Sequence, residues 1–165
     1  MKIITDNLFV CSAEEYDQFS KSHYDFVAIR ASLITFVRTI KRLRNEGQSV
    51  SSLSPYVIVN NELILKLRDS HRLSDIDPVI IDAALNWIYS NITQRIVIIH
   101  CSKGQSRSPS IAMLYLNCIG YFENFSFEES EQIFKKIYPD YSANKGIREF
   151  LSLNWEKYRN KLFHH

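Results

Sequence analysis

Short runs of apolar residues alternate along the chain with longer segments in which apolar positions recur every three or four residues. The short runs predict β-strands, because buried strands are brief and rich in β-branched residues. Residues 6–12 and 24–31 are two such runs, and 95–100 is typical of a strand buried on both faces. Residues 56–69 hold two apolar runs around Asn-Asn-Glu, which predicts either a β-hairpin or two successive strands.

The longer segments have the periodicity of amphipathic helices. Ser12 and Asp77 are suitable N-caps, and Pro78 fits a first helical turn. Ser126 and Glu129 form a capping box. Strands lead, helices follow and the two mix in the middle, which predicts an α/β fold with a central sheet covered by helices. The predicted helices are residues 12–22, 33–44, 77–91, 108–122, 126–139 and 144–163.

The predicted helix at 33–44 has two sides of different chemistry. Its apolar positions are expected to face the core, and its other side is basic. A basic helix side is usually a solvated face, and docking of an acidic substrate is the alternative. The apolar positions are Ile34, Val37, Ile40 and Leu43, and the basic ones are Arg38, Lys41, Arg42 and Arg44.

The composition is that of one globular domain. The chain has 165 residues, of which 45% are hydrophobic and 23% charged, and this is enough to form a single core. A net charge of +2 gives no reason to expect nucleic acid as a partner. We therefore expect one domain over residues 1–165.

Cysteine usage indicates a reducing compartment. Cys11, Cys101 and Cys118 are too few, and odd in number, for a disulfide framework. Residues 1–10 contain polar interruptions and do not form a signal peptide, and no stretch is long enough to span a membrane. These features predict a cytoplasmic protein. Cys11 and Cys118 are expected to pack as small hydrophobes, with a role as resolving thiol for Cys101 as the alternative.

The segment HCSKGQSRSPS, from His100 to Ser110, carries the most specific chemical signal. Cys101 and Arg107 are separated by five residues, in a loop between a predicted buried strand and a predicted helix. Backbone N–H groups in such a loop can point inward, and the helix N-terminus adds positive potential, so the loop can hold an anion. Gly104 permits a left-handed or crowded backbone. These surroundings favour a thiolate at Cys101, and the Arg107 guanidinium can grip two phosphate oxygens.

This loop predicts displacement at phosphorus by the Cys101 sulfur, followed by hydrolysis of a cysteinyl-phosphate. No residue cluster has metal-ligand spacing, and we expect no metal and no other cofactor. The leaving oxygen needs a proton, which a nearby carboxylic acid can supply. Asp77 better fits a helix N-cap, and Asp75 has no assigned partner. Asp69 ends an apolar strand where a loop begins, so it is the preferred acid.

The stretch HCSKGQSRS resembles the His-Cys-x5-Arg-Ser/Thr signature of cysteine-dependent protein phosphatases, and the rest of the chain resembles their compact dual-specificity branch. Residues 67–88 resemble the acid loop of that family and the helix after it. Residues 125–151 are similar to its closing helices, with an Asn-x-Gly before the last one. The resemblance covers most of the chain and implies a central, mostly parallel twisted sheet of four to five strands flanked by helices.

The resemblance also implies a role for each residue of the site. Cys101 is the nucleophile, and Asp69 acts first as acid and then as base. Ser108 stabilises the leaving thiolate during hydrolysis, and Arg107 clamps the phosphate. The implied phosphate-binding residues are Ser102, Lys103, Gly104, Gln105, Ser106 and Arg107.

The implied activity is that of a metal-independent phosphatase acting on phosphotyrosine in proteins, with phosphoserine and phosphothreonine as further options. Alternatives with the same chemistry are a phosphoinositide, another small phosphate ester or an RNA 5′ end. A phosphate-binding module with weak turnover is a further alternative. The expected partner is therefore a phosphorylated protein or another phosphomonoester, and the sequence carries no signal for the oligomeric state.

The chain departs from the family pattern in three places. It has no Trp-Pro-Asp acid loop. Residues 33–55 exceed what a minimal family member needs, and we interpret them as a recognition insert. Lys103 and Gln105 stand where small apolar residues are often found. A lysine here could favour an acidic or polyphosphorylated substrate, although one lysine is not enough to carry that specificity over.

Overall fold

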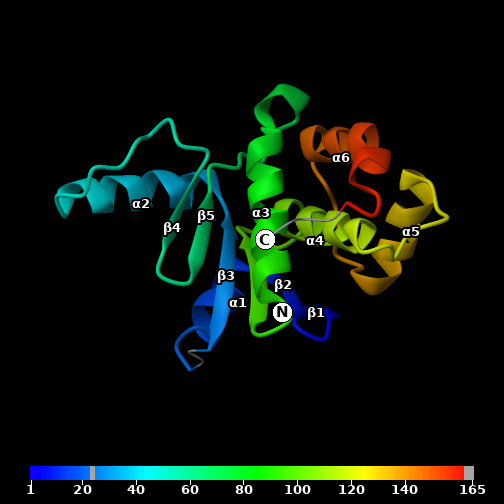
Figure 1. Cartoon of the computed structure of the whole chain (residues 1–165), viewed down its shortest axis with the longest axis horizontal. Coiled ribbons are helices and arrows are strands. Elements are labelled where there is room, and N and C mark those ends of the chain that lie inside the picture. The colour runs from blue at the N-terminus through cyan, green and yellow to red at the C-terminus, as the bar shows by residue number, and fades with distance from the viewer. Residues whose placement is uncertain (23–24, 162–165) are drawn as a thin grey trace.

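The computed structural model describes residues 1–22 and 25–161. Its strands are β1 (Lys2–Thr5), β2 (Leu8–Ser12), β3 (Phe26–Ala31), β4 (Tyr56–Val59), β5 (Glu62–Leu65) and β6 (Ile96–Cys101). They form one sheet in the order β1-β2-β6-β3-β5-β4 (Figure 1). The four inner strands are parallel and the two edge strands antiparallel. The expectation of a mostly parallel central sheet is therefore confirmed.

The sheet has six strands, one more than the upper end of the expected four to five. The additional strand is β1, which pairs with β2 across a tight turn and has exposed or half-buried residues throughout. Two apolar residues in a strand of four make a pattern too short to recognise. The alternatives for residues 56–69 are also resolved: β4 and β5 form an antiparallel hairpin, with Asn60 in the left-handed region at φ 54°.

Helices cover both faces of the sheet (Figure 1). Helices α1 (Ala13–Phe19) and α2 (Leu33–Asn45) lie on one face, where apolar clusters form around Tyr16 and Phe36. The main core fills the other face, beneath the remaining helices. Those helices are α3 (Pro78–Asn91), α4 (Arg107–Cys118), α5 (Phe127–Ile137) and α6 (Lys145–Tyr158), and the short 3₁₀ helix η1 (Leu73–Asp75) precedes α3.

The cap predictions are confirmed at three helices. The side chain of Ser12 accepts from the backbone N–H of Glu15 at the start of α1. Asp77 accepts from the N–H of Val79, at 2.9 Å, at the start of α3. Ser126 opens α5 with the expected capping box. Across the described residues, no helix combines the length and apolar character needed to cross a bilayer.

The predicted core face of α2 is partly wrong. Ile34 and Val37 are 62% and 56% exposed, whereas Phe36 and Thr39 are buried together with Ile40. Positions spaced strictly by three drift by about 60° per step around a helix of 3.6 residues per turn. The helix instead rests on the sheet through Phe36 and Ile40, which pack against Ile64 of β5.

Candidate active site

The loop between β6 and α4 lies at the carboxyl edge of the parallel strands. Cys101 is the last residue of β6, and Arg107 is the first residue of α4. Gly104 has φ +72°, and a Cβ on it would lie 2.9 Å from the backbone carbon of Cys11 and from the backbone nitrogen of Ser12. Only glycine therefore fits here, because the loop is pressed against the end of β2.

Contacts from the segment before α6 hold the loop in shape. The hydroxyl of Tyr138 donates to the carbonyl of Gly104 at 2.8 Å. The backbone N–H of Ser142 donates to the carbonyl of Gln105 at 2.8 Å. The backbone N–H of Asn144 donates to Ser106 Oγ at 3.0 Å. The sequence pattern assigned no role to these three residues, because two of the three donors are backbone N–H groups.

Cys101 lies at the bottom of a small hollow and is only 2% exposed. Ser108 Oγ donates to its Sγ at 3.2 Å, so a hydrogen-bond donor already faces the sulfur. The hollow measures about 220 Å³, and its other lining residues are Asp69, Lys103, Gln105, Ser106, Ser142 and Asn144. The structure thus brings the expected acid and nucleophile to the same hollow.

Arg107 is buried, with 6% of its surface exposed. Its Nη1 donates to the carbonyl of Leu67 at 3.4 Å, and its Nη2 donates to Ser102 Oγ at 3.2 Å. The same Nη2 lies 3.7 Å from Asp69 Oδ2, which makes a long ion pair. The guanidinium is therefore fixed between the loop and the segment that carries Asp69.

Asp69 is the upstream carboxylate that faces the hollow. Its Oδ1 accepts from Ser106 Oγ at 2.9 Å. Asp75 instead accepts from Ser70 Oγ at 2.5 Å, and this hydrogen bond, with the nearby Arg72, lowers the pKa of the Asp75 carboxyl. Asp77 caps α3 as expected. Position and partners therefore favour Asp69 over both as the acid.

Gly146 lets helix α6 approach the segment that follows Asp69. A Cβ on Gly146 would lie 2.6 Å from the carbonyl oxygens of Ser70 and Arg72. Its N–H donates to the Ser70 carbonyl at 3.1 Å. There is no space for a methyl group between these backbones.

Replacing Gly146 with Ala is expected to push the Asp69 segment away from the hollow. We expect a loss of about 1–3 kcal/mol in the free energy of unfolding from overpacking, and a fall in kcat beyond what the folded fraction explains. Urea unfolding and turnover of p-nitrophenyl phosphate measure the two effects. Lys145→Ala, at the exposed neighbouring position, is the control. Unchanged values for Gly146→Ala would show that this close approach is unimportant.

His100 is the buried residue of β6 that precedes Cys101. It stacks on Tyr16 with 4.2 Å between the ring centroids. Within the described part of the chain, neither ring nitrogen has a hydrogen-bond partner. Burial lowers the pKa of His100 to about 3, with the positive charges of Arg30 and Arg107 adding to the effect. The ring is therefore neutral at physiological pH.

This buried histidine predicts a pH dependence of stability. The unfolded chain takes up a proton at His100 near a pKa of about 6.5, whereas the folded chain does not until pH is near 3. Stability should therefore fall as pH drops below about 6.5, by up to roughly 1.4 kcal/mol per pH unit. Urea unfolding between about pH 7 and pH 5 should show a smaller fall for His100→Asn than for the unmodified chain. Equal falls would contradict this origin.

The other two cysteines are buried and free. Burial raises the pKa of the thiols of Cys11 and Cys118 to about 12. Ser12, not Cys11, pairs with Cys101 across β2 and β6, so the side chains of Cys11 and Cys101 point to opposite faces of the sheet. The geometry favours packing over a resolving role for Cys11. Among the described residues, no three His, Cys, Asp or Glu side chains are grouped as metal ligands would be.

Comparisons with known proteins give matches in structure alone. No family model and no curated protein matches the chain. DUSP15 is 16% identical, with 97% of this chain and 92% of that chain covered and a TM-score of 0.65. The Yvh1 phosphatase domain from Chaetomium thermophilum is 18% identical, with 94% and 95% covered and a TM-score of 0.65. OH1 from the Orf virus, a tyrosine phosphatase with triple substrate specificity, is 16% identical, with 98% and 87% covered and a TM-score of 0.57.

At these identities the likeness concerns the fold. It extends over nearly the whole chain and agrees with the resemblance carried by residues 100–108. The matched part of the chain includes the parallel sheet, the loop between β6 and α4, and the closing helices α5 and α6. The chain therefore has the fold of the compact, cysteine-dependent dual-specificity phosphatases.

Proposed function

We propose that this protein is a phosphatase that hydrolyses phosphate monoesters through a cysteinyl-phosphate intermediate. One observation carries the proposal: a single hollow contains the sulfur of Cys101, with Ser108 hydrogen-bonded to it, and the carboxylate of Asp69. Arg107 is held beside that hollow by an ion pair with Asp69. A nucleophile, an acid and an anion clamp at one site are the parts that phosphoryl transfer needs.

In the first step, the Cys101 sulfur attacks phosphorus while the phosphate oxygens are held by the N–H groups of residues 102–106 and by Arg107. The bond between phosphorus and the leaving oxygen breaks, and protonated Asp69 gives its proton to that oxygen. The product alcohol or phenol departs, and the phosphoryl group remains on sulfur. The contact of Asp69 with Ser106 supports this role, because it holds the carboxyl at the loop.

In the second step, water attacks the phosphorus of the cysteinyl-phosphate. Asp69, now a carboxylate, takes a proton from the water. The sulfur–phosphorus bond breaks, and the electron pair returns to sulfur as a thiolate. The hydroxyl of Ser108, at 3.2 Å from the sulfur, stabilises this thiolate by hydrogen bonding. Every proton and oxygen comes from the substrate, from water or from these residues, and Arg107 supplies positive charge to the phosphate, so we propose a metal-independent cycle.

The proposed substrates are phosphotyrosine in proteins, with phosphoserine and phosphothreonine as further substrates. The depth of Cys101, only 2% exposed, favours an ester long enough to reach the floor of the hollow. We further propose that residues 33–55 form a recognition insert within a single domain; exposed Val37 and Leu53 give that segment an apolar surface. The three free cysteines support a reducing, cytoplasmic location.

A substrate panel tests the proposed activity. We expect kcat/KM to be highest on phosphotyrosine peptides, to be unaffected by EDTA and to be inhibited by orthovanadate. A phosphoserine peptide, a phosphoinositide and a 5′-phosphorylated RNA are the comparison substrates. A kcat/KM on the lipid or RNA about tenfold or more above that on the peptides would replace the proposed substrate class. Tight phosphopeptide binding without turnover of any substrate would indicate a binding module.

A further inference from the structure

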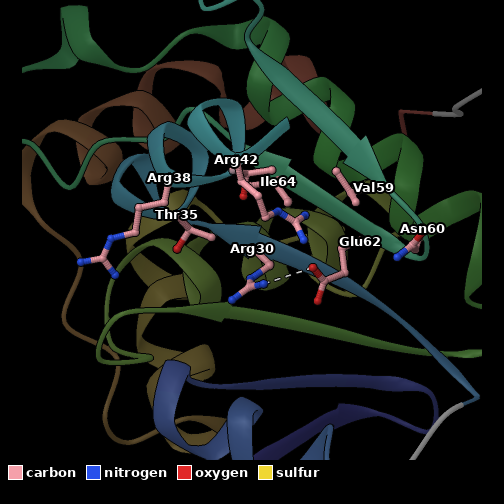
Figure 2. Close-up of a pocket in the computed structure, with 9 residues that line it drawn as sticks. Arg30, Thr35, Arg38, Arg42, Val59, Asn60, Glu62 and Ile64 are labelled. Carbon is pink, nitrogen blue, oxygen red and sulfur yellow. Dashed lines mark hydrogen bonds and ion pairs between the residues drawn. The ribbon is translucent and has the colours of Figure 1, made fainter. Parts of the chain in front are cut away.

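A second hollow lies on the opposite face of the sheet, between α2 and strands β3 and β5 (Figure 2). It measures about 460 Å³, a volume within the range of roughly 300–1,000 Å³ found for small-molecule pockets. The residues that matter for its chemistry are Arg30, Thr35, Arg38, Thr39, Arg42 and Glu62.

The charge of this hollow is positive and unbalanced. Glu62 is the acidic residue among those that line it. Both of its oxygens are engaged, because Oε1 accepts from the hydroxyl of Tyr16 and Oε2 accepts from Arg30 Nη1 at 3.1 Å. The guanidinium groups of Arg38 and Arg42 have no hydrogen bond or ion pair with any other residue that the structure describes. Helix α2 itself contains no Asp or Glu.

The lining positions of α2 share one side of the helix. Arg38 and Arg42 are four residues apart, as are Thr35 and Thr39, and such pairs are neighbours on a helix surface. Figure 2 shows the guanidinium groups of Arg30 and Arg42 directed into the same hollow, whereas that of Arg38 points away from them. Planar guanidinium groups match the oxygens of phosphate better than an ammonium group does.

From these observations we propose that this hollow binds the phosphate group of a small phosphorylated molecule. Arg42 and Arg30 hold the phosphate oxygens, and Thr35 and Thr39 line the site with hydroxyls. Arg38, a further lining residue, adds positive charge to the site. A solvated basic face would spread its charges over a convex surface. Here positive charges from two elements converge on one concavity, which favours a small anion over an extended acidic partner.

This site is separate from the Cys101 loop. Arg30 pairs with His100 on the neighbouring strand, and the side chains of His100 and Cys101 point to opposite faces of the sheet because they are consecutive. The lining residues of the two hollows do not overlap. The proposal of this second site therefore does not depend on the proposed phosphatase activity.

The test uses the whole chain carrying Arg107→Met, so that the Cys101 loop loses its clamp. Arginine Nε–Hε NMR signals are followed as inorganic phosphate is added, with sodium chloride at matched ionic strength as the control for screening. We expect saturable shifts of the Arg42 and Arg30 signals. Loss of saturable phosphate binding in this chain would show that the loop is the sole anion site and would overturn the proposal.

Two neighbouring substitutions sharpen the test. Arg42→Gln should weaken phosphate binding about tenfold or more, because a forked, charge-assisted contact is lost. Lys41→Gln removes the same charge from the next position, which does not line this hollow, and should change the affinity less than about twofold. If both variants bound phosphate equally more weakly, the positive charge of α2 would attract anions in general, and the proposed site would be contradicted.

A second series of binding measurements distinguishes between two classes of ligand for this hollow. Glycerol 3-phosphate, a small phosphate monoester, is compared with an acidic peptide that carries no phosphate, again in the Arg107→Met chain. Tighter binding of glycerol 3-phosphate, sensitive to Arg42→Gln, supports the proposed ligand class. Tighter binding of the peptide at the same arginines would overturn it in favour of a docking surface for acidic proteins.

Discussion

Replacing Cys101 with Ser is expected to lower kcat for p-nitrophenyl phosphate by about four orders of magnitude or more. The variant keeps the shape of the loop and the Arg107 clamp, but a neutral hydroxyl is a far weaker nucleophile than a thiolate. Orthovanadate and phosphate should therefore still bind. The free energy of unfolding should change little, since one sulfur is exchanged for one oxygen at the floor of a polar hollow.

The matched control for this prediction is Cys118→Ser. Cys118 is buried at the end of α4, and burial raises the pKa of its thiol to about 12. The same change of atoms there should leave kcat per folded molecule unchanged. Near-normal turnover by Cys101→Ser would contradict the assignment of the nucleophile.

Replacing Asp69 with Asn is expected to slow turnover in a way that depends on the leaving group. For phenyl phosphate, whose leaving oxygen needs a proton, kcat/KM should fall by about 10²–10⁴. For p-nitrophenyl phosphate the fall should be much smaller, because nitrophenolate leaves without protonation. The amide can still accept the hydrogen bond that Ser106 now gives to Asp69 Oδ1, so the shape of the loop should be retained.

Asp75→Asn is the control for the acid. Asp75 holds Ser70 and Arg72 and does not line the Cys101 hollow. Its replacement should affect the two esters alike, through the position of the segment. A strong dependence on the leaving group in Asp75→Asn, without one in Asp69→Asn, would move the acid assignment to Asp75.

Local signals in the sequence predicted the elements that position the site. The caps at Ser12, Asp77 and Ser126 depend on residues three or fewer positions away, so a single chain reveals them. The spacing from Cys101 to Arg107 is also local, and the strand before it was evident from its β-branched run. The structure then brings Asp69 to the same hollow, across 32 positions of sequence.

Contacts between distant backbones could not be predicted in this way. The N–H groups of Ser142 and Asn144 support the loop, and a backbone donor leaves no trace in the pattern of side chains. The buried side of α2 depends on what Ile64 of β5 presents to it. The second hollow could not be predicted for the same reason, because two of its lining residues, Arg30 and Glu62, come from different strands.

The most direct test of the central claim is to trap the phosphoenzyme. Asp69→Asn is mixed with p-nitrophenyl phosphate, quenched within milliseconds and analysed by peptide mass spectrometry. Without its base, the variant should hydrolyse the intermediate slowly. We therefore predict a phosphoryl group on the peptide that contains Cys101. The double variant, in which Cys101→Ser is combined with Asp69→Asn, should carry no phosphoryl group there. A phosphoryl group on another residue, or rapid turnover with none on sulfur, would contradict the account.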